Sequence, residues 1–209
     1  MKTYFLHKNS QSKKLIIFAS GFASHYSHFC HLKSKENVLM LYDYSEFDLN
    51  LELKGFDEFA LIAFSMGVCV SARFLKHINF TQKIAINGTN YGIDDEFGIK
   101  KELFLKQCKD FSLVGFKKAL FAKNLDKAKN FYFNDEDYLK NELTSLYNLC
   151  NKQAIGLKFD KALLSKKDLV FSTKASENFF NKENTKIIYT KEPHFVFFAF
   201  ETWEDICNI

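Results

Sequence analysis

The chain of 209 residues has little of what marks secreted, membrane-spanning or disulfide-stabilised proteins. Its five cysteines are odd in number and widely spaced, which predicts reduced thiols rather than a disulfide framework. The longest apolar run, residues 195–200, is far too short to cross a bilayer, and residues 1–14 hold no apolar core of signal-peptide length. These absences predict a cytoplasmic protein that neither enters nor spans a membrane.

Arginine is nearly absent as well, since Arg73 is the sole arginine of the chain. The net charge of +4 therefore rests on lysine, which binds phosphate or carboxylate as a point charge without arginine's two-pronged geometry. No groove-reading motif, glycine-rich phosphate loop or dinucleotide fingerprint accompanies that charge. The sequence thus supports neither nucleotide chemistry nor sequence-specific nucleic-acid recognition, and it leaves a carboxylate-rich partner open.

A metal site is not expected, although His25, His28 and His31 lie close together in the sequence. On a helix, each step of three residues rotates a side chain by about −60°, so the first and third histidines would diverge by about 120°. No aspartate or glutamate lies in the cluster to complete a site. We expect no metal and no other cofactor. His25, four residues after Gly21, is interpreted as a residue at the mouth of a substrate site.

The chain does contain a series of short apolar runs that alternate with segments of helical spacing. The runs cover residues 2–7, 15–20, 38–42, 59–64, 83–87, 162–165 and 186–189. This alternation predicts one α/β domain over residues 1–209, with a mostly parallel sheet covered by helices on both faces. In open sheets of this kind a ligand binds at the carboxyl ends of the strands.

Residues 94–160 interrupt the alternation and predict a helical lid inserted between two strands. Helical spacing covers residues 101–110, 113–122 and 135–151. A lid supplies apolar walls that exclude water from a site. The candidate wall residues are Phe104, Phe111, Phe116, Leu120, Phe121 and Tyr147. Any of these is also compatible with an ordinary core, since an aromatic stripe is what a buried helix face shows.

Ser65 lies where one of the apolar runs meets a helix-like segment. Residues 59–64 read as a strand and residues 68–78 as a helix, which is the layout of a nucleophile elbow. The residues two before and two after the serine must be small, because strand and helix fold back on each other; Ala63 and Gly67 meet this requirement. The five-residue pattern alone is weak evidence for a nucleophile elbow, so the interpretation depends on whether the chain also contains a suitable acid and histidine.

The partners of a serine nucleophile occur in the order typical of α/β-hydrolases, which is serine, acid, histidine. Of the two later histidines, His77 falls near the end of the expected helix, whereas His194 follows a strand-like run and the chain's single proline, Pro193. Proline stiffens that loop. His194 is therefore the candidate base.

The acid is expected in the loop after the preceding strand, residues 162–165, where Asp168 lies. Asp43, Asp94 and Asp95 are rivals, because they also follow strand-like runs.

Two backbone N–H groups are expected to bind the oxyanion that forms during acyl transfer. One is the amide of Met66, directly after the nucleophile and at the positive end of its helix. The other is the amide of Phe22, in the loop after the strand at residues 15–20, where Gly21 lets the backbone turn closely.

The combined motifs resemble the pimeloyl-acyl-carrier-protein methyl ester esterases of the BioG type over nearly the whole chain. The motifs are Ser20-Gly21-Phe22, Leu41-Tyr42-Asp43-Tyr44-Ser45, Ala63-Phe64-Ser65-Met66-Gly67-Val68, Ala85-Ile86-Asn87-Gly88-Thr89 and Pro193-His194-Phe195. The resemblance implies a minimal α/β-hydrolase fold and a serine carboxylesterase that removes the methyl group from a carrier-bound pimeloyl ester in biotin biosynthesis.

The resemblance also implies acyl-carrier protein as the partner. An acidic carrier would need positive charge near the mouth of the site, which Lys117, Lys118 and Lys123 would supply, although such lysines are commonly solvated helix faces. The residues alone indicate a serine hydrolase with an apolar acyl pocket. Two alternatives stay open: a general short-chain esterase or thioesterase, and a catalytically inactive binding module.

Overall fold

The computed structural model describes residues 1–150 and 156–209, and within these residues seven strands form one sheet. The strands are β1 (Lys2–His7), β2 (Lys14–Ala19), β3 (Asn37–Tyr42), β4 (Glu58–Phe64), β5 (Gln82–Ile86), β6 (Lys161–Ser165) and β7 (Lys186–Thr190). Their order is β1-β3-β2-β4-β5-β6-β7, and β1 pairs antiparallel with β3 while the other pairs are parallel. The predicted α/β class and all seven predicted strands are confirmed.

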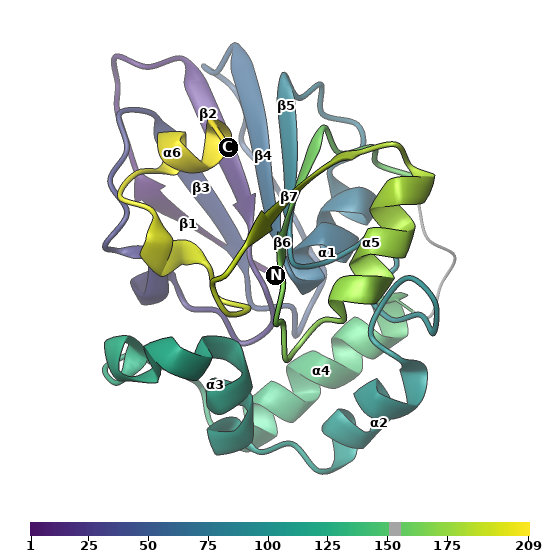
Figure 1. The fold of residues 1–209 in the computed structure, drawn as a ribbon. Coiled ribbons are helices and arrows are strands. Elements are labelled where there is room, and N and C mark those ends of the chain that lie inside the picture. The colour runs from purple at the N-terminus through teal and green to yellow at the C-terminus, as the bar shows by residue number, and fades with distance from the viewer. Residues whose placement is uncertain (151–155) are drawn as a thin grey trace.

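Beyond the polar residues at their starts, the central strands are largely apolar because both of their faces are covered. On β2, Ile16 and Phe18 pack into one core, and Leu15 and Ile17 pack into the core on the opposite face. The second core is closed by α1 (Met66–Phe74) and α5 (Thr173–Lys182). Figure 1 shows these two helices side by side on one side of the sheet.

The first core is covered by short elements rather than long helices. They are η1 (Tyr26–Phe29), η3 (Phe197–Ala199) and α6 (Trp203–Cys207). Phe29, Phe197 and Trp203 are fully buried there and pack around the ring of Phe18. No helix was predicted from the sequence at the positions of α5 and α6; α6 has only five residues, and only part of α5 carries apolar residues.

The expected helices after β5 form a separate layer, here called the cap, across the carboxyl ends of the strands. The cap consists of α2 (Lys101–Lys109), α3 (Leu113–Phe121), η2 (Ala122–Ala128) and α4 (Glu136–Cys150), which lie together below the sheet in Figure 1. Asn151, the last residue of the third predicted helix, lies outside the described residues. α1 ends at Phe74, earlier than predicted, so His77 lies beyond the helix and is exposed.

A buried carboxyl group joins the cap to the sheet. Glu142 of α4 is only 2% exposed. Its Oε1 accepts a hydrogen bond from the backbone N–H of Tyr44 at 3.1 Å, and its Oε2 accepts one from the N–H of Ala23 at 3.4 Å. Burial raises the pKa of Glu142 to about 8, and the nearby carboxylate of Asp43 adds to the rise. The side chain thus enters the fold in its neutral form at neutral pH.

We predict that Glu142→Gln flattens the pH dependence of stability. The unfolded carboxyl ionises above its ordinary pKa of 4.5, whereas the folded one stays protonated up to about pH 8. Ionisation therefore favours the unfolded chain, and the stability of the parent relative to the variant should fall by about 3 kcal/mol between pH 5 and pH 8. Chemical unfolding of both proteins across this range measures the difference, and parallel curves would contradict the prediction.

Candidate active site

Ser65 occupies a strained turn between β4 and α1. Its φ of 55° and ψ of −125° place a non-glycine residue in a region that L side chains rarely adopt. The serine stands at the N-cap of α1, but its hydroxyl makes no capping hydrogen bond. The Oγ atom instead lies 2.9 Å from Nε2 of His194. The turn thus directs the hydroxyl away from the helix and towards the histidine, as expected of an elbow.

Gly67 lets α1 lie directly against the end of β2. A Cβ atom at this position would lie 2.1 Å from the carbonyl oxygen of Ala19 and 2.3 Å from that of Ser20, both of which are backbone atoms. Ala63, on the other side of the serine, pairs in register with Ala19 and is fully buried. The small residues that the elbow requires are therefore explained by backbone packing.

His194 and Asp168 complete a buried chain of hydrogen bonds with Ser65. Nδ1 of His194 donates to Oδ2 of Asp168 at 2.6 Å, which leaves Nε2 to accept from the serine hydroxyl. The two side chains are each 1% exposed. Oδ1 of Asp168 accepts hydrogen bonds from the N–H groups of Val170 and Phe171, both at 2.8 Å, so the carboxylate is held in place by its own turn.

The rival acids are engaged elsewhere. Asp43 accepts from Tyr138 and Ser45 and pairs with Lys2. Asp94 accepts hydrogen bonds from the backbone N–H groups of Glu96 and Phe97, and Asp95 accepts one from the backbone N–H of Lys101. Among the predicted acids, the structure brings only Asp168 to the histidine.

A cavity of about 450 Å³ opens above Ser65, between the sheet and the cap. Its floor holds Gly21, Phe22, Ser65, Met66 and His194. The two residues predicted to donate to the oxyanion therefore lie beside the serine. The volume is within the ordinary range of small-molecule sites, roughly 300–1,000 Å³.

Four of the predicted wall residues line this cavity, namely Phe104, Phe111, Phe116 and Leu120. Sequence reasoning missed several others: Ile99, Leu103, Gln107, Asp110, Ser112, Gly115, Ala119, Leu143, Leu169 and Val170. Helical spacing could have found Leu103 and Ala119. The two residues after Asp168 carried no signal, because they come close to the cavity only through the turn that holds the carboxylate.

The other two predicted wall residues, and His25, which was predicted at the mouth of the site, are not among the residues that line the cavity. Phe121 is fully buried and packs against the rings of Phe131 and Phe195. Tyr147 stacks on Phe104 from the side of α4. His25 lies against the rings of Tyr26 and Tyr132, so it contributes to an aromatic cluster rather than to the cavity wall.

The three histidines that resemble a metal cluster each bond to a different group. His25 bonds through Nδ1 to the hydroxyl of Ser27 at 2.8 Å. Nε2 of His28 lies 2.6 Å from the carbonyl oxygen of Tyr132, and Nε2 of His31 lies 3.0 Å from that of Phe197. Within the described part of the chain, no group of metal-binding side chains comes together.

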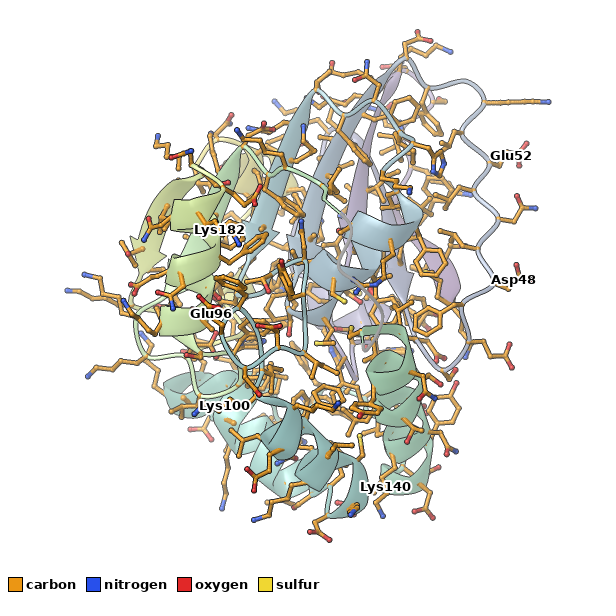
Figure 2. The ribbon with its side chains drawn as sticks, turned by 90° about the vertical axis from the view of Figure 1, so that its right-hand side faces the viewer. Asp48, Glu52, Glu96, Lys100, Lys140 and Lys182 are labelled. Carbon is orange, nitrogen blue, oxygen red and sulfur yellow. The ribbon has the colours of Figure 1, made fainter. Side chains whose placement is uncertain are left out.

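The three predicted carrier-contact lysines differ in their surroundings. Lys117 lies over the ring of Phe133 at 5.1 Å. Lys123 pairs with Glu192 at 2.9 Å, in the loop that leads to His194, so part of its charge is neutralised. Lys118 is exposed on α3. Figure 2 shows two further lysines, Lys100 at the start of α2 and Lys140 on α4, on the part of the molecule where the cap lies.

The fold and the site together define a carboxylic ester hydrolase of the α/β-hydrolase fold. The family model for the pimeloyl-ACP methyl esterase BioG matches residues 1–206, and the chain belongs to this family. The family acts on the methyl ester of pimeloyl-acyl-carrier protein, so the predicted family and reaction are confirmed, together with their place in biotin biosynthesis.

The solved structures agree with this fold. BioG from Haemophilus influenzae superposes with a TM-score of 0.90 at 24% identity, over 98% of this chain and 99% of that one. A lipase-esterase related protein from Clostridium acetobutylicum gives a TM-score of 0.69 at 19% identity, over 99% and 98% of the two chains.

One relative carries a different activity in its name. A malonyl-[acyl-carrier protein] O-methyltransferase from Bacteroides fragilis is 32% identical over 96 residues, which are 44% of this chain and 20% of the relative.

Among the described residues of the present chain, no helix has both the length and the apolar character needed to cross a membrane.

We predict that Gly67→Ala lowers the stability by about 3 kcal/mol and abolishes esterase activity, because the new methyl group must displace the backbone of β2. Gly115→Ala is the matched control for stability. A Cβ at Gly115 would lie 3.7 Å from Ser112, an ordinary contact. Because alanine favours a helix more than glycine does, Gly115→Ala should raise the stability of the protein by up to about 1 kcal/mol. Thermal unfolding of both variants measures the two effects. Equal melting temperatures for Gly67→Ala and the parent would contradict the packing argument.

Proposed function

We propose that this chain hydrolyses the methyl ester of pimeloyl-acyl-carrier protein by covalent catalysis, with Ser65 as nucleophile, His194 as general base and Asp168 as the acid that orients the base. The observation that carries the proposal is the buried chain of hydrogen bonds from Asp168 through His194 to Ser65, at the floor of an apolar cavity. The amides of Phe22 and Met66, which line the same floor, would bind the oxyanion.

In the first half of the reaction, Oγ of Ser65 attacks the ester carbonyl carbon while Nε2 of His194 takes the hydroxyl proton. Asp168 stabilises the imidazolium that forms. The carbonyl oxygen, on which negative charge develops, accepts hydrogen bonds from the amides of Phe22 and Met66. When the intermediate collapses, the C–O bond to the methoxy group breaks, and His194 returns the proton to release methanol.

In the second half, water attacks the acyl group on Ser65 with His194 again as the base. The bond to Oγ then breaks, the serine regains its proton from His194, and the free pimeloyl carboxylate leaves. Because the carboxylate is charged and the cavity wall is apolar, the product binds more weakly than the ester, which favours its release.

The cap is proposed to act as the lid over the acyl chain. Phe104, Phe111 and Phe116 provide an apolar wall for the methylene groups, and Leu120 extends it. Gln107, Asp110 and Ser112 also line the cavity and could bond to the polar arm of a carrier. The methyltransferase relative supports a carrier-bound methyl ester as substrate, because its named reaction places a methyl group on a carrier-bound acid.

We predict that Ser65→Ala leaves pimeloyl methyl ester on acyl-carrier protein uncleaved while the parent removes its methyl group. Mass spectrometry of the carrier measures this loss directly. A fluorophosphonate probe, which reacts with activated serines, should label the parent and not the variant.

Other outcomes would contradict the proposal in distinguishable ways. If both proteins leave the carrier-bound ester intact while the parent cleaves simple esters, the chain is a general short-chain esterase or thioesterase with the same nucleophile. If the parent cleaves nothing and the probe labels nothing, the chain is a binding module. If Ser65→Ala retains the parent's activity, the nucleophile is wrongly assigned.

Carrier docking is proposed beside the cavity mouth, on the surface formed by Lys117 and Lys118 of α3 and Lys123 of η2. Neighbouring α3 residues Phe116 and Ala119 line the cavity, so a carrier bound to this face would need only a short reach for its arm. Lys118 is the most suitable single contact, because it is exposed, whereas the other two lysines lie over a ring or pair with Glu192.

We predict that Lys118→Glu raises KM for the carrier-bound ester about fivefold at low salt and leaves kcat unchanged, because it removes attraction to an acidic carrier. Lys76→Glu is the matched control. Lys76 is also exposed, but it follows the C-terminal end of α1, whereas Ser65 lies at the N-terminal end of that helix. Turnover of a simple ester should be the same in both variants. If Lys118→Glu and Lys76→Glu have equal KM values for the carrier-bound ester, Lys118 does not contact the carrier.

A further inference from the structure

A buried asparagine stands at the junction of the segments that carry Ser65, Asp168 and His194. Asn87 follows directly after β5, which lies between β4 and β6, the strands that lead to Ser65 and Asp168. The residue is 2% exposed and has a φ of 48°, in the left-handed region that asparagine tolerates better than most residues. Nothing in the proposed reaction uses this side chain.

The amide nitrogen of Asn87 holds the loop that carries the histidine. Nδ2 donates to the carbonyl oxygen of His194 at 2.8 Å and to Oγ of Ser165 at 2.7 Å. Oγ of Ser165 donates in turn to the carbonyl oxygen of Pro193 at 2.9 Å. Asn87 therefore holds two consecutive carbonyl groups of the histidine loop: that of His194 directly, and that of Pro193 through the hydroxyl of Ser165.

The same residue also holds the strand that leads to the acid. Oδ1 of Asn87 accepts from the backbone N–H of Ser165 at 2.7 Å, and its own N–H donates to the carbonyl oxygen of Leu163 at 3.1 Å. Ser165 ends β6, three residues before Asp168. The side chain thus spans the gap between the acid strand and the base loop.

The residues beside Asn87 in the chain contact the nucleophile. The carbonyl oxygen of Ile86 accepts from the N–H of Ser65 at 2.8 Å. A Cβ at Gly88 would lie 2.2 Å from the carbonyl oxygen of Ser65, so the backbone there lies directly beneath the elbow. One tripeptide therefore contacts the segments of the nucleophile, the acid and the base.

Only an amide satisfies these contacts. The two backbone partners have fixed polarity, because an N–H can only donate and a carbonyl oxygen can only accept. Aspartate would place an oxygen against the His194 carbonyl oxygen. Alanine would leave a buried N–H and two buried oxygen atoms without this partner, at the full desolvation cost of each group.

We propose that Asn87 is a positioning residue, which holds His194 at hydrogen-bond distance from Ser65 and in line with Asp168. The inference rests on the proposed assignment of these three residues. It assigns a role to the Ala85-Ile86-Asn87-Gly88-Thr89 motif, which the proposed reaction leaves without one. Because the contacts are to the backbone of the base loop, their loss displaces the imidazole without touching the substrate.

Asn87→Ala should therefore lower kcat rather than raise KM. Displacements of about 1 Å at a reacting group cost on the order of 100-fold in rate, so a 10- to 100-fold loss of kcat is expected, with KM changed less than threefold. Asn87→Asp should lose at least as much, although it preserves the shape of the side chain.

Asn90→Ala is the matched control. Asn90 follows three residues later, is 3% exposed, and donates from Nδ2 to the carbonyl oxygen of Leu157 at 3.0 Å, so it is an equally buried asparagine with a backbone partner. It bonds to none of the three reacting residues. The control should lose stability without the specific loss of kcat.

The experiment compares the parent, Asn87→Ala, Asn87→Asp, Asn90→Ala and Ser65→Ala in three measurements. These are kcat and KM on a simple aryl ester, the rate of labelling by a fluorophosphonate probe, and the low-field proton NMR signal of the His194–Asp168 hydrogen bond. Thermal unfolding identifies any variant that is not folded. The expected result is slow labelling and a shifted or broadened proton signal for both Asn87 variants, with parent-like values for Asn90→Ala.

The outcomes separate this inference from the assignment on which it rests. If Ser65→Ala is labelled as fast as the parent, the nucleophile itself is wrong. If Ser65→Ala is not labelled but folded Asn87→Ala matches Asn90→Ala in kcat and proton signal, Asn87 serves only the fold and the inference is overturned. If Asn87→Ala does not fold, folded Asn87→Asp decides in the same way.

Discussion

The close approach of backbone at the end of β4 is the constraint on which the site depends. The elbow at Ser65 packs against β2 through Gly67 and against the residues after β5 through Gly88, and neither position has room for a Cβ atom. Because backbone groups cannot move aside as flexible side chains do, these contacts restrict the serine to one position relative to the sheet. The positive φ of Ser65 is the local cost of that packing.

The histidine and the acid are placed by a different means, which is hydrogen bonding to loops that have no regular structure of their own. Asp168 is held by two N–H groups of its own turn, and the His194 loop is held by Asn87, Ser165 and Phe195, whose N–H donates to Leu120 of the cap. The base loop therefore contacts both the sheet below and the cap above. A change in the cap can therefore reach the loop that carries the imidazole through the hydrogen bond between Phe195 and Leu120.

The cap supplies the apolar character of the cavity, and its attachment is partly polar. Glu142 reaches from α4 to the N–H of Ala23, the residue after the proposed oxyanion donor Phe22. Lys123 and Asn124 of η2 both bond to Glu192, two residues before His194. The elements proposed to cover the acyl chain are thus attached to both loops at which the chemistry is proposed to occur, so that cap position and site geometry are coupled.

The strands, the elbow and the order of the proposed reacting residues could be predicted from local sequence patterns. Strands that are covered on both faces carry runs of apolar residues, which makes β2 to β6 recognisable, and the small residues around Ser65 are a local requirement. Which of the four candidate carboxylates contacts His194 depends on the folded molecule, where it is Asp168. The fold also separates Phe104 and Phe116, which line the cavity, from Phe121 in the core and His25 in an aromatic cluster. These outcomes depend on which face of a helix meets which loop. That choice is made by packing between residues far apart in the chain, and no local pattern encodes it.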